Sequence, residues 1–335
     1  MSNVITSKNF TKSLEIALDG DFDCDAAIKR LQGIIDNMPA SVINMKIKKN
    51  VPEFYEHESG SKKQKYLCKS DSRIYLLARK RYCESLLNVL KEKNALNDME
   101  SHSQIFTLNK HFKLSLKRLT KLVENFDRGN LDLARIVMTS EQYKWYTRAQ
   151  SGKSVEGYDG VLHETSRGIT VRSKSERDIG NACEKLCAFY RYEDRLTVNV
   201  SKLVSALGEK LRDYIGEKHL FYPTAHGCDW TVPPELAWMN AKGSVWRSFK
   251  QNPGTILVHP DFTFMLADGS KVLWEHEGLF DDFTYRCNST ERAAIYLYTE
   301  TVARDNLIET FESEVDDEEK IQAIIASRIL PRLWF

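Results

Sequence analysis

Two apolar segments, residues 262–266 and 271–275, constrain this chain more than any other feature of its sequence. Both have the composition of β-strands, and Asp268-Gly269 lies between them. An Asp-Gly pair between two such segments is a strong signal for the tight turn of a β-hairpin. The pattern therefore predicts an antiparallel hairpin in the C-terminal third of the chain.

Acidic residues lie at the open end of this predicted hairpin. Counting outward from the turn places Asp261 and Glu275 on neighbouring strands at nearly the same height. Glu277 follows Glu275 by two residues, so the strand period puts both side chains on one face. Carboxylates this close raise each other's pKa unless a cation compensates them. A divalent metal is the simplest compensation, since Mg²⁺ typically takes one or two carboxylates together with substrate phosphate.

Pro260-Asp261, followed fourteen residues later by Glu275-His276-Glu277, resembles the signature of the PD-(D/E)XK nuclease superfamily, the restriction-endonuclease-like proteins. The resemblance implies that Asp261, Glu275 and the backbone carbonyl of His276 bind Mg²⁺ or Mn²⁺. It also implies that the metal activates a water molecule for attack on phosphate. Glu277 occupies the place where the common Glu-x-Lys triplet of the family has Lys. Some restriction endonucleases of the superfamily also have Glu at that place.

The missing Lys leaves two questions open. Glu277 could bind a second metal ion or accept a proton from the attacking water. The positive charge that Lys supplies in relatives could come instead from Lys271, Lys174 or Arg292, and the sequence does not choose among them.

The order of predicted elements around the hairpin supports the same resemblance. A helix from 173–175 to about 190 precedes a strand at 190–198. After the hairpin come a helix at 289–302, a strand at 306–311 and a helix at 316–329. This order resembles the αβββαβ core of the family over about residues 170–330. We therefore expect an α+β chain whose C-terminal domain, 151–335, has this core, with an insertion at about 201–252.

The N-terminal half, residues 1–150, predicts a helical domain with a small antiparallel sheet. Two helices are expected within 1–40, and alternating segments at 42–68 indicate strands with one polar face. Two long amphipathic helices, from about 70 to 94 and from 103 to 126, predict a helical hairpin. Residues 128–170 look irregular and are interpreted as a connector. This arrangement, in which helices, a small sheet and a helical hairpin precede the nuclease-like half, resembles bacterial and phage proteins.

Positive charge is concentrated in the predicted helical hairpin. The segment 62–121 holds fifteen Lys and Arg against five Asp and Glu. Such a face is either simply solvated or contacts nucleic-acid phosphates without reading sequence. The basic residues expected on its outer faces are Arg79, Lys80, Lys91, Lys93, Lys110, Lys113, Lys117, Arg118 and Lys121, of which Lys113, Lys117 and Lys121 are the candidates for nucleic-acid contact.

Further candidates lie at the start of the C-terminal domain. Arg172 and Lys174 precede a helix whose N-terminus can itself attract phosphate, and Lys271 lies on the hairpin. Family members often add an acidic residue from the first core helix, and Glu176 matches that position. The alternative is that Glu176 only stabilises the first turn through the helix dipole. Glu193 could face the site or pair with a neighbouring arginine.

Composition bounds the remaining possibilities. The 335 residues carry a net charge of only +1, so no global bias points to nucleic acid. Seven cysteines without a CxxC pair indicate a reducing cytoplasm. The N-terminus lacks a basic-then-apolar signal and no apolar segment approaches ~18 residues, so neither secretion nor membrane insertion is expected.

These patterns predict a Mg²⁺- or Mn²⁺-dependent nuclease, with DNA as the expected substrate, that could form a homo-oligomer. Asp261, Glu275, Glu277 and Glu176 are the predicted catalytic residues. The alternative is a non-catalytic nucleic-acid-binding or assembly protein on a degenerate nuclease fold. The missing Lys favours this alternative, whereas the clustered acids favour the nuclease.

Overall fold

A computed structural model describes residues 5–49, 51–58, 63–97, 102–148, 158–199, 255–279, 292–293, 295–296 and 303–335. The chain combines helices with small sheets, as expected for an α+β protein, and it divides into two compact units. The first comprises Met1–Thr147, Lys185–Ala188 and Ile325–Phe335, and the second comprises Arg148–Glu184 and Phe189–Ile324. The insertion expected at 201–252 lies outside the described residues, as does most of the helix expected at 289–302.

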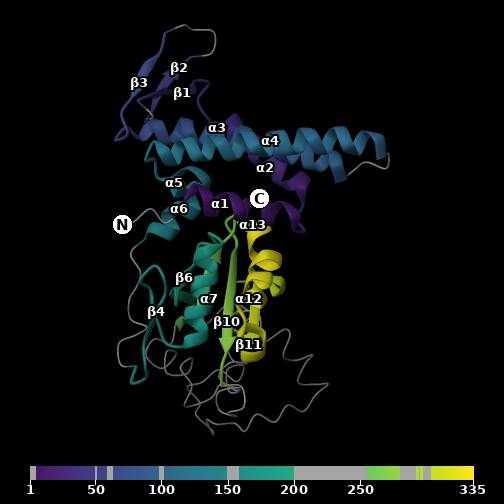
Figure 1. Cartoon of the computed structure of the whole chain (residues 1–335). Helices are drawn as coiled ribbons and strands as arrows, with labels where there is room; N and C mark the ends of the chain where they lie inside the picture. The colour runs from purple at the N-terminus through teal and green to yellow at the C-terminus, as the bar shows by residue number, and fades with distance from the viewer. Residues whose placement is uncertain are drawn as a thin grey trace. The chain divides into compact units, whose positions relative to one another are not determined.

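The first unit is mainly helical (Figure 1). Its helices are α1 (Ser7–Asp19), α2 (Cys24–Asp36), α3 (Ser72–Asn97), α4 (His102–Arg128), α5 (Leu133–Val137), α6 (Ser140–Thr147) and α13 (Leu330–Trp334), the last preceded by a π-helical turn at Ile325–Ile329. The predicted helical hairpin is confirmed, because α3 and α4 lie side by side and are joined by only a short link.

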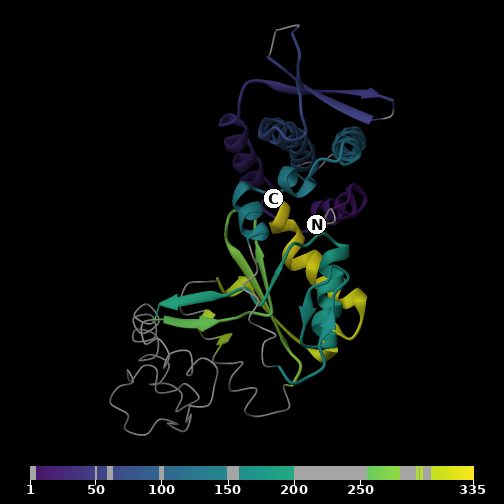
Figure 2. The ribbon, with the colours of Figure 1, turned by 90° about the vertical axis from the view of Figure 1, so that its left-hand side faces the viewer.

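The predicted small sheet is also confirmed in this unit. Strands β1 (Val42–Lys48), β2 (Val51–His57) and β3 (Lys65–Leu67) pair antiparallel in that order. Figure 2 shows the sheet against the α3–α4 pair, where Ile43, Phe54 and Leu67 supply its buried face.

Helix α1 packs against the C-terminal helix α13 in this unit. Thr6 caps it by accepting a 3.3 Å hydrogen bond from the Asn9 N–H, and its buried residues recur at helical spacing. Trp334 of the C-terminal helix donates a 2.9 Å hydrogen bond from its indole nitrogen to Oγ of Ser13. The helix ends at Gly20, where a Cβ atom would lie 2.5 Å from the Pro331 ring, so only glycine fits without displacement.

The second unit contains a mixed four-stranded sheet. Its members are β6 (Arg191–Tyr192), β9 (Phe262–Met265), β10 (Lys271–Glu277) and β11 (Leu307–Phe311), in the order β11-β10-β9-β6. Strand β10 is parallel to β11 and antiparallel to β9. The other elements are α7 (Lys174–Lys185), α11 (Glu312–Val315), α12 (Glu318–Ile324), a 3₁₀ turn at Arg304–Asn306 and two short antiparallel pairs, β4 (His163–Glu164) with β5 (Thr170–Val171) and β7 (Leu196–Asn199) with β8 (Thr255–Val258).

The predicted hairpin is confirmed as β9 and β10. Lys271 pairs with Met265 and Trp274 with Phe262. Gly269 takes a φ of +87° in the turn, a conformation that glycine adopts without steric cost. The buried rings of Phe262 and Trp274 lie 6.2 Å apart and help form the core of the sheet.

Several expectations from the sequence were wrong. The segment 128–170 is not an irregular connector, since it contains α5, α6 and the β4–β5 pair. The strand expected at 190–198 breaks into β6 and β7 at Glu193, whose φ is +45°. Opposite this break lies Pro260, which has no N–H to donate to a strand ladder. The final helix is interrupted, and its last part belongs to the first unit.

Candidate functional site

The candidate site lies in the second unit, where β9 begins and β10 ends. Continuing the β9–β10 register by one pair places Asp261 directly opposite Glu275. Both side chains are buried, as is that of Glu277. Glu275 and Glu277 share one face of β10 because side chains on a strand alternate. The sheet therefore brings together the three carboxylates that the hairpin pattern predicts.

The carboxylate of Asp261 is oriented by the backbone of the neighbouring strand. Its Oδ2 accepts a 2.8 Å hydrogen bond from the backbone N–H of His276, and its Oδ1 lies 3.5 Å from the guanidinium of Arg172. Burial raises the pKa of Asp261, and the nearby charge of Glu176 raises it further. The His276 N–H and the two nearby arginines only partly offset this effect, so the site disfavours an uncompensated negative charge.

Glu275 is held by two partners from the partly described segment at 292–296. Its Oε1 accepts a 2.6 Å hydrogen bond from the hydroxyl of Tyr296, and its Oε2 lies 3.5 Å from Nε of Arg292. Burial raises the pKa of Glu275, and the charge of Asp261 adds to the shift. The two facing carboxylates therefore repel each other across the hairpin.

Arg292 lies beside the triplet Glu275-His276-Glu277. Besides Glu275, its guanidinium contacts Oε1 of Glu277 at 3.6 Å. Lys271 lies at the other end of β10 next to the turn, and Lys174 is exposed. Of the three cations that the sequence left open, Arg292 is the one that contacts both Glu275 and Glu277.

Arg172, which contacts Oδ1 of Asp261, also pairs with Glu193. Burial is the main cause that raises the pKa of Glu193 to about 7. Of the two alternatives for Glu193, the structure supports a position at the site, because Glu193 pairs with Arg172, which also contacts Asp261. Arg191 instead binds the neighbouring Asp194 at 2.8 Å.

Glu176 serves as a helix cap in this structure. Its Oε2 accepts hydrogen bonds from the backbone N–H groups of Arg172 and Ser173, at 2.8 and 3.1 Å, and from the Tyr192 hydroxyl at 2.8 Å. Ser173 in turn accepts from the Glu176 N–H at 3.1 Å, which completes a reciprocal capping box. The geometry thus supports the capping interpretation, while Glu176 remains close enough to raise the pKa of Asp261.

The imidazole of His276 points away from the carboxylates. Its Nδ1 lies 3.4 Å from the hydroxyl of Thr310 and its Nε2 lies 3.2 Å from Glu312. This agrees with the alternation of side chains along β10. Only the backbone of His276 faces Asp261.

Two further members of the cluster were not predicted from the sequence. Tyr296 donates to Glu275, and Glu309 pairs with Glu275 in the parallel β10–β11 register. Partial burial and the charge of Glu277 raise the pKa of Glu309. The apolar pattern around Glu309 marked a strand, but no sequence signal gave its partner strand.

The candidate nucleic-acid contacts in the first unit lie on α4. Lys113, Lys117 and Lys121 are exposed and follow one another at four-residue spacing along one face, together with Lys110 and Arg128. The prediction for α3 was partly wrong. Lys80 is buried and donates to the Pro39 carbonyl at 2.6 Å, while Arg79 donates to the carbonyl of Met138.

Two carboxylates, those of Asp261 and Glu275, are the candidates to hold a metal ion at the acidic site. Among the described residues, no group of three or more His, Cys, Asp or Glu side chains is arranged to hold a metal ion together. Mg²⁺ does not require such a group, since one or two carboxylates with water and phosphate suffice. Asp261 and Glu275 fit this requirement, because their buried carboxylates face each other and repel each other.

Comparisons with protein-family models, curated proteins and solved structures found no match for this chain. Within the described part of the chain, no helix has both the length and the apolar character needed to span a membrane.

Proposed function

We propose that this chain is a metal-dependent nuclease that hydrolyses phosphodiester bonds, with DNA as the expected substrate. One observation carries the proposal: Asp261 and Glu275 are buried opposite each other at the open end of the β9–β10 hairpin. Burying two facing carboxylates is unfavourable unless cations compensate them, and an arrangement with that cost suits a site that recruits a cation.

The topology of the second unit supports a restriction-endonuclease-like core. Helix α7 precedes a sheet in which β6, β9 and β10 are antiparallel neighbours and β11 is parallel to β10. The partly described helical residues 292–296 lie between β10 and β11 in the chain. This arrangement is compatible with the αβββαβ order that the sequence predicts.

The residues of the site have distinct proposed roles. Asp261 and Glu275 would hold Mg²⁺ or Mn²⁺, which lowers the pKa of a bound water and neutralises charge on the phosphate. The His276 N–H and the Tyr296 hydroxyl orient these two carboxylates. Arg292 supplies the positive charge that a Lys of the triplet supplies in relatives.

Glu277 is the proposed proton acceptor for the attacking water. It lies on the same face of β10 as Glu275, and its contact with Arg292 keeps it beside the metal-binding pair. A general base has to lie within reach of the water that it deprotonates. In this account Arg172 and Lys174, at the start of α7, and the basic face of α4 contact nucleic-acid phosphates.

A second function has a specific observation in its favour. Arg172 and Arg292 already neutralise part of the carboxylate charge, as in a structural ion-pair network. In that case the chain would bind nucleic acid or assemble with it without cutting. Both functions predict DNA binding, so only cleavage separates them.

The test is incubation of the pure protein with plasmid, linear and single-stranded DNA and with RNA, each with Mg²⁺, Mn²⁺ or EDTA. The nuclease proposal expects cleavage of at least one DNA substrate with Mg²⁺ or Mn²⁺ and none with EDTA. DNA binding without cleavage under every condition would assign the binding function instead.

A further inference from the structure

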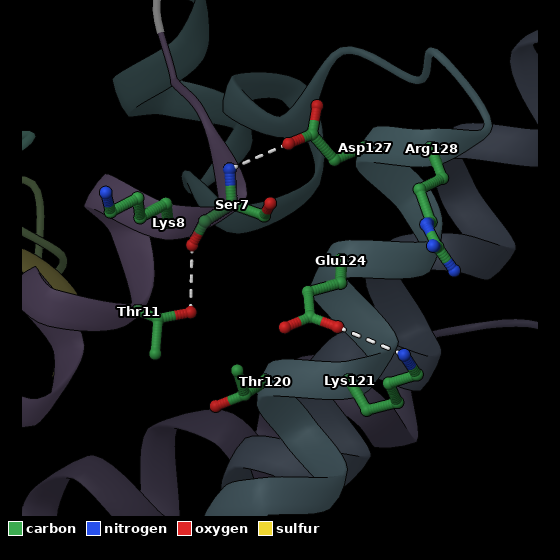
Figure 3. A pocket seen from close by; sticks show the side chains of 8 residues that line it. All are labelled: Ser7, Lys8, Thr11, Thr120, Lys121, Glu124, Asp127 and Arg128. Carbon is green, nitrogen blue, oxygen red and sulfur yellow. Dashed lines mark hydrogen bonds and ion pairs between the residues drawn. The ribbon is translucent and has the colours of Figure 1, made fainter.

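A polar cavity lies in the first unit between α1 and α4, far along the chain from the acidic site. Its volume is about 620 Å³, within the range of small-molecule sites, roughly 300–1,000 Å³. Figure 3 shows Ser7, Lys8 and Thr11 contributed by α1, with the remaining side chains contributed by α4. The eight lining residues are Ser7, Lys8, Thr11, Thr120, Lys121, Glu124, Asp127 and Arg128.

The charges that line the cavity leave a positive excess. Lys121 pairs with Glu124 at 3.2 Å, and Asp127 accepts a 2.9 Å hydrogen bond from the Ser7 N–H. Lys8 and Arg128 are exposed, and neither forms an ion pair with any residue in the described part of the chain. In Figure 3 they lie on opposite sides of the cavity. Two cations are thus free to bind an anion there.

The uncharged lining narrows the chemistry of that anion. Thr120 presents a hydroxyl group, the Thr11 hydroxyl donates to the Ser7 carbonyl at 2.8 Å, and all eight lining side chains are polar or charged. Glu124 and Asp127 retain acceptor oxygens besides those already in use. A ligand that fits combines an anionic group for the cations with hydroxyl or amino donors for the carboxylates.

We propose that this cavity binds the phosphate of a nucleotide, with Arg128 on the phosphate, Lys8 on the opposite side of the cavity and the acids on the sugar or base. Lys and Arg are common phosphate ligands, and Arg can bind it through two parallel hydrogen bonds. The site goes beyond the proposed catalytic function and does not depend on Asp261 or Glu275.

The position of the cavity on α4 allows two sources for such a phosphate. Lys110, Lys113, Lys117, Lys121 and Arg128 follow one another at three-, four- or seven-residue spacing, so they share one exposed face that ends at the cavity. A nucleic-acid strand along this face would bring its terminal phosphate to the cavity. A free mononucleotide would present the same group.

The experiment measures binding to the full chain in EDTA, where metal-dependent cleavage is silent. The probes are adenosine 5′-monophosphate, adenosine, and one short single-stranded DNA oligonucleotide with and without a 5′-phosphate. Calorimetry or fluorescence anisotropy gives each Kd. We expect each phosphorylated probe to bind at least about tenfold more tightly than its unphosphorylated partner, which corresponds to a modest interaction energy.

Matched variants locate the binding. Lys8→Gln with Arg128→Gln should weaken binding of the phosphorylated probes by about tenfold or more. Lys12→Gln with Arg118→Gln changes exposed cations of the same two helices outside the cavity and should have little effect. Thermal unfolding of each variant checks that the first unit is intact.

The remaining outcomes are equally defined. Tighter binding of the phosphorylated oligonucleotide than of the mononucleotide identifies a strand end as the ligand, and equal binding identifies a free nucleotide. The proposal is overturned if no phosphorylated probe binds with a Kd below about 1 mM, or if the two double variants behave alike. Asp261→Asn should retain this binding, so failure of the nuclease proposal would leave the result interpretable.

Discussion

The backbone N–H of His276 donates a 2.8 Å hydrogen bond to Oδ2 of Asp261. The carboxylate that precedes β9 is thus fixed by the backbone of β10, next to Glu275. A shift of the hairpin register by one residue would break this bond and move Glu275 to the other face. Strand pairing and site geometry therefore depend on each other.

This bond predicts different stabilities for two variants of Asp261. Asp261→Ala leaves the buried His276 N–H without its acceptor, which costs about 1–3 kcal/mol. Asp261→Asn keeps a carbonyl oxygen for that bond and removes the buried carboxyl group, whose pKa is raised by burial. We expect urea denaturation to show lower stability for the alanine variant and near-native stability for the asparagine variant. Equal stabilities would show that the hydrogen bond is unimportant.

The contacts of Arg292 predict a strong coupling with Glu277. Arg292→Gln removes the cation between Glu275 and Glu277, and loss of one partner from a buried ion pair costs roughly 3–5 kcal/mol. Adding Glu277→Gln removes one of the repelling acids and should recover part of this loss. A double-mutant cycle by chemical denaturation measures the coupling, and additive effects of the two changes would contradict the ion-pair arrangement.

The raised carboxyl pKa values predict that stability falls as pH rises. Burial and neighbouring charge raise the pKa of Glu275 and Asp261, and burial raises that of Glu193 to about 7. The folded chain therefore holds protons that the unfolded chain releases above about pH 4.5. The resulting stability is complete below that pH and is lost as pH rises through the folded pKa values.

The measurement is the free energy of unfolding in EDTA from about pH 5 to pH 8. Each proton that the folded chain retains and the unfolded chain releases lowers this free energy by at most ~1.4 kcal/mol per pH unit. Glu275→Gln should flatten the profile, whereas Glu319→Gln, an exposed acid on α12, should not. If the Glu275→Gln profile has the wild-type slope, Glu275 does not titrate in this range.

The capping box predicts the behaviour of Glu176. Glu176→Gln retains an oxygen for the N–H groups of Arg172 and Ser173, so we expect near-native stability and retained cleavage. Ser173→Ala removes the reciprocal acceptor and should cost about 1 kcal/mol. Loss of cleavage in a stable Glu176→Gln protein would instead place Glu176 among the catalytic residues.

The strongly periodic elements of this fold were predictable from the sequence, and so was the local part of the site. The Asp268-Gly269 turn set the register that aligns Asp261 with Glu275, because a hairpin is a local structure. The pairing of Arg172 with Glu193 was not predictable. Their pairing depends on a break in the β6–β7 strand and on side chains twenty-one residues apart, for which the sequence carries no periodic signal.

The first unit shows the same limit. Apolar spacing predicted α3 and α4, yet Arg79 and Lys80 of α3 were assigned to the wrong face. Lys80 is buried because the carbonyl groups of Pro39 and Ser41 accept hydrogen bonds from its ammonium group. Such compensation comes from tertiary packing and cannot be read from helical periodicity alone.

Anomalous diffraction from a crystal grown with Mn²⁺ tests the central claim most directly. We predict a metal peak bonded to carboxylate oxygens of both Asp261 and Glu275 at about 2.1–2.2 Å, roughly the range for oxygen ligands of small divalent ions. Asp261→Asn should abolish the peak, and Glu319→Gln should retain it. At saturating Mn²⁺, a site without a peak, in which Arg172 and Arg292 still pair with the two carboxylates, would contradict the account.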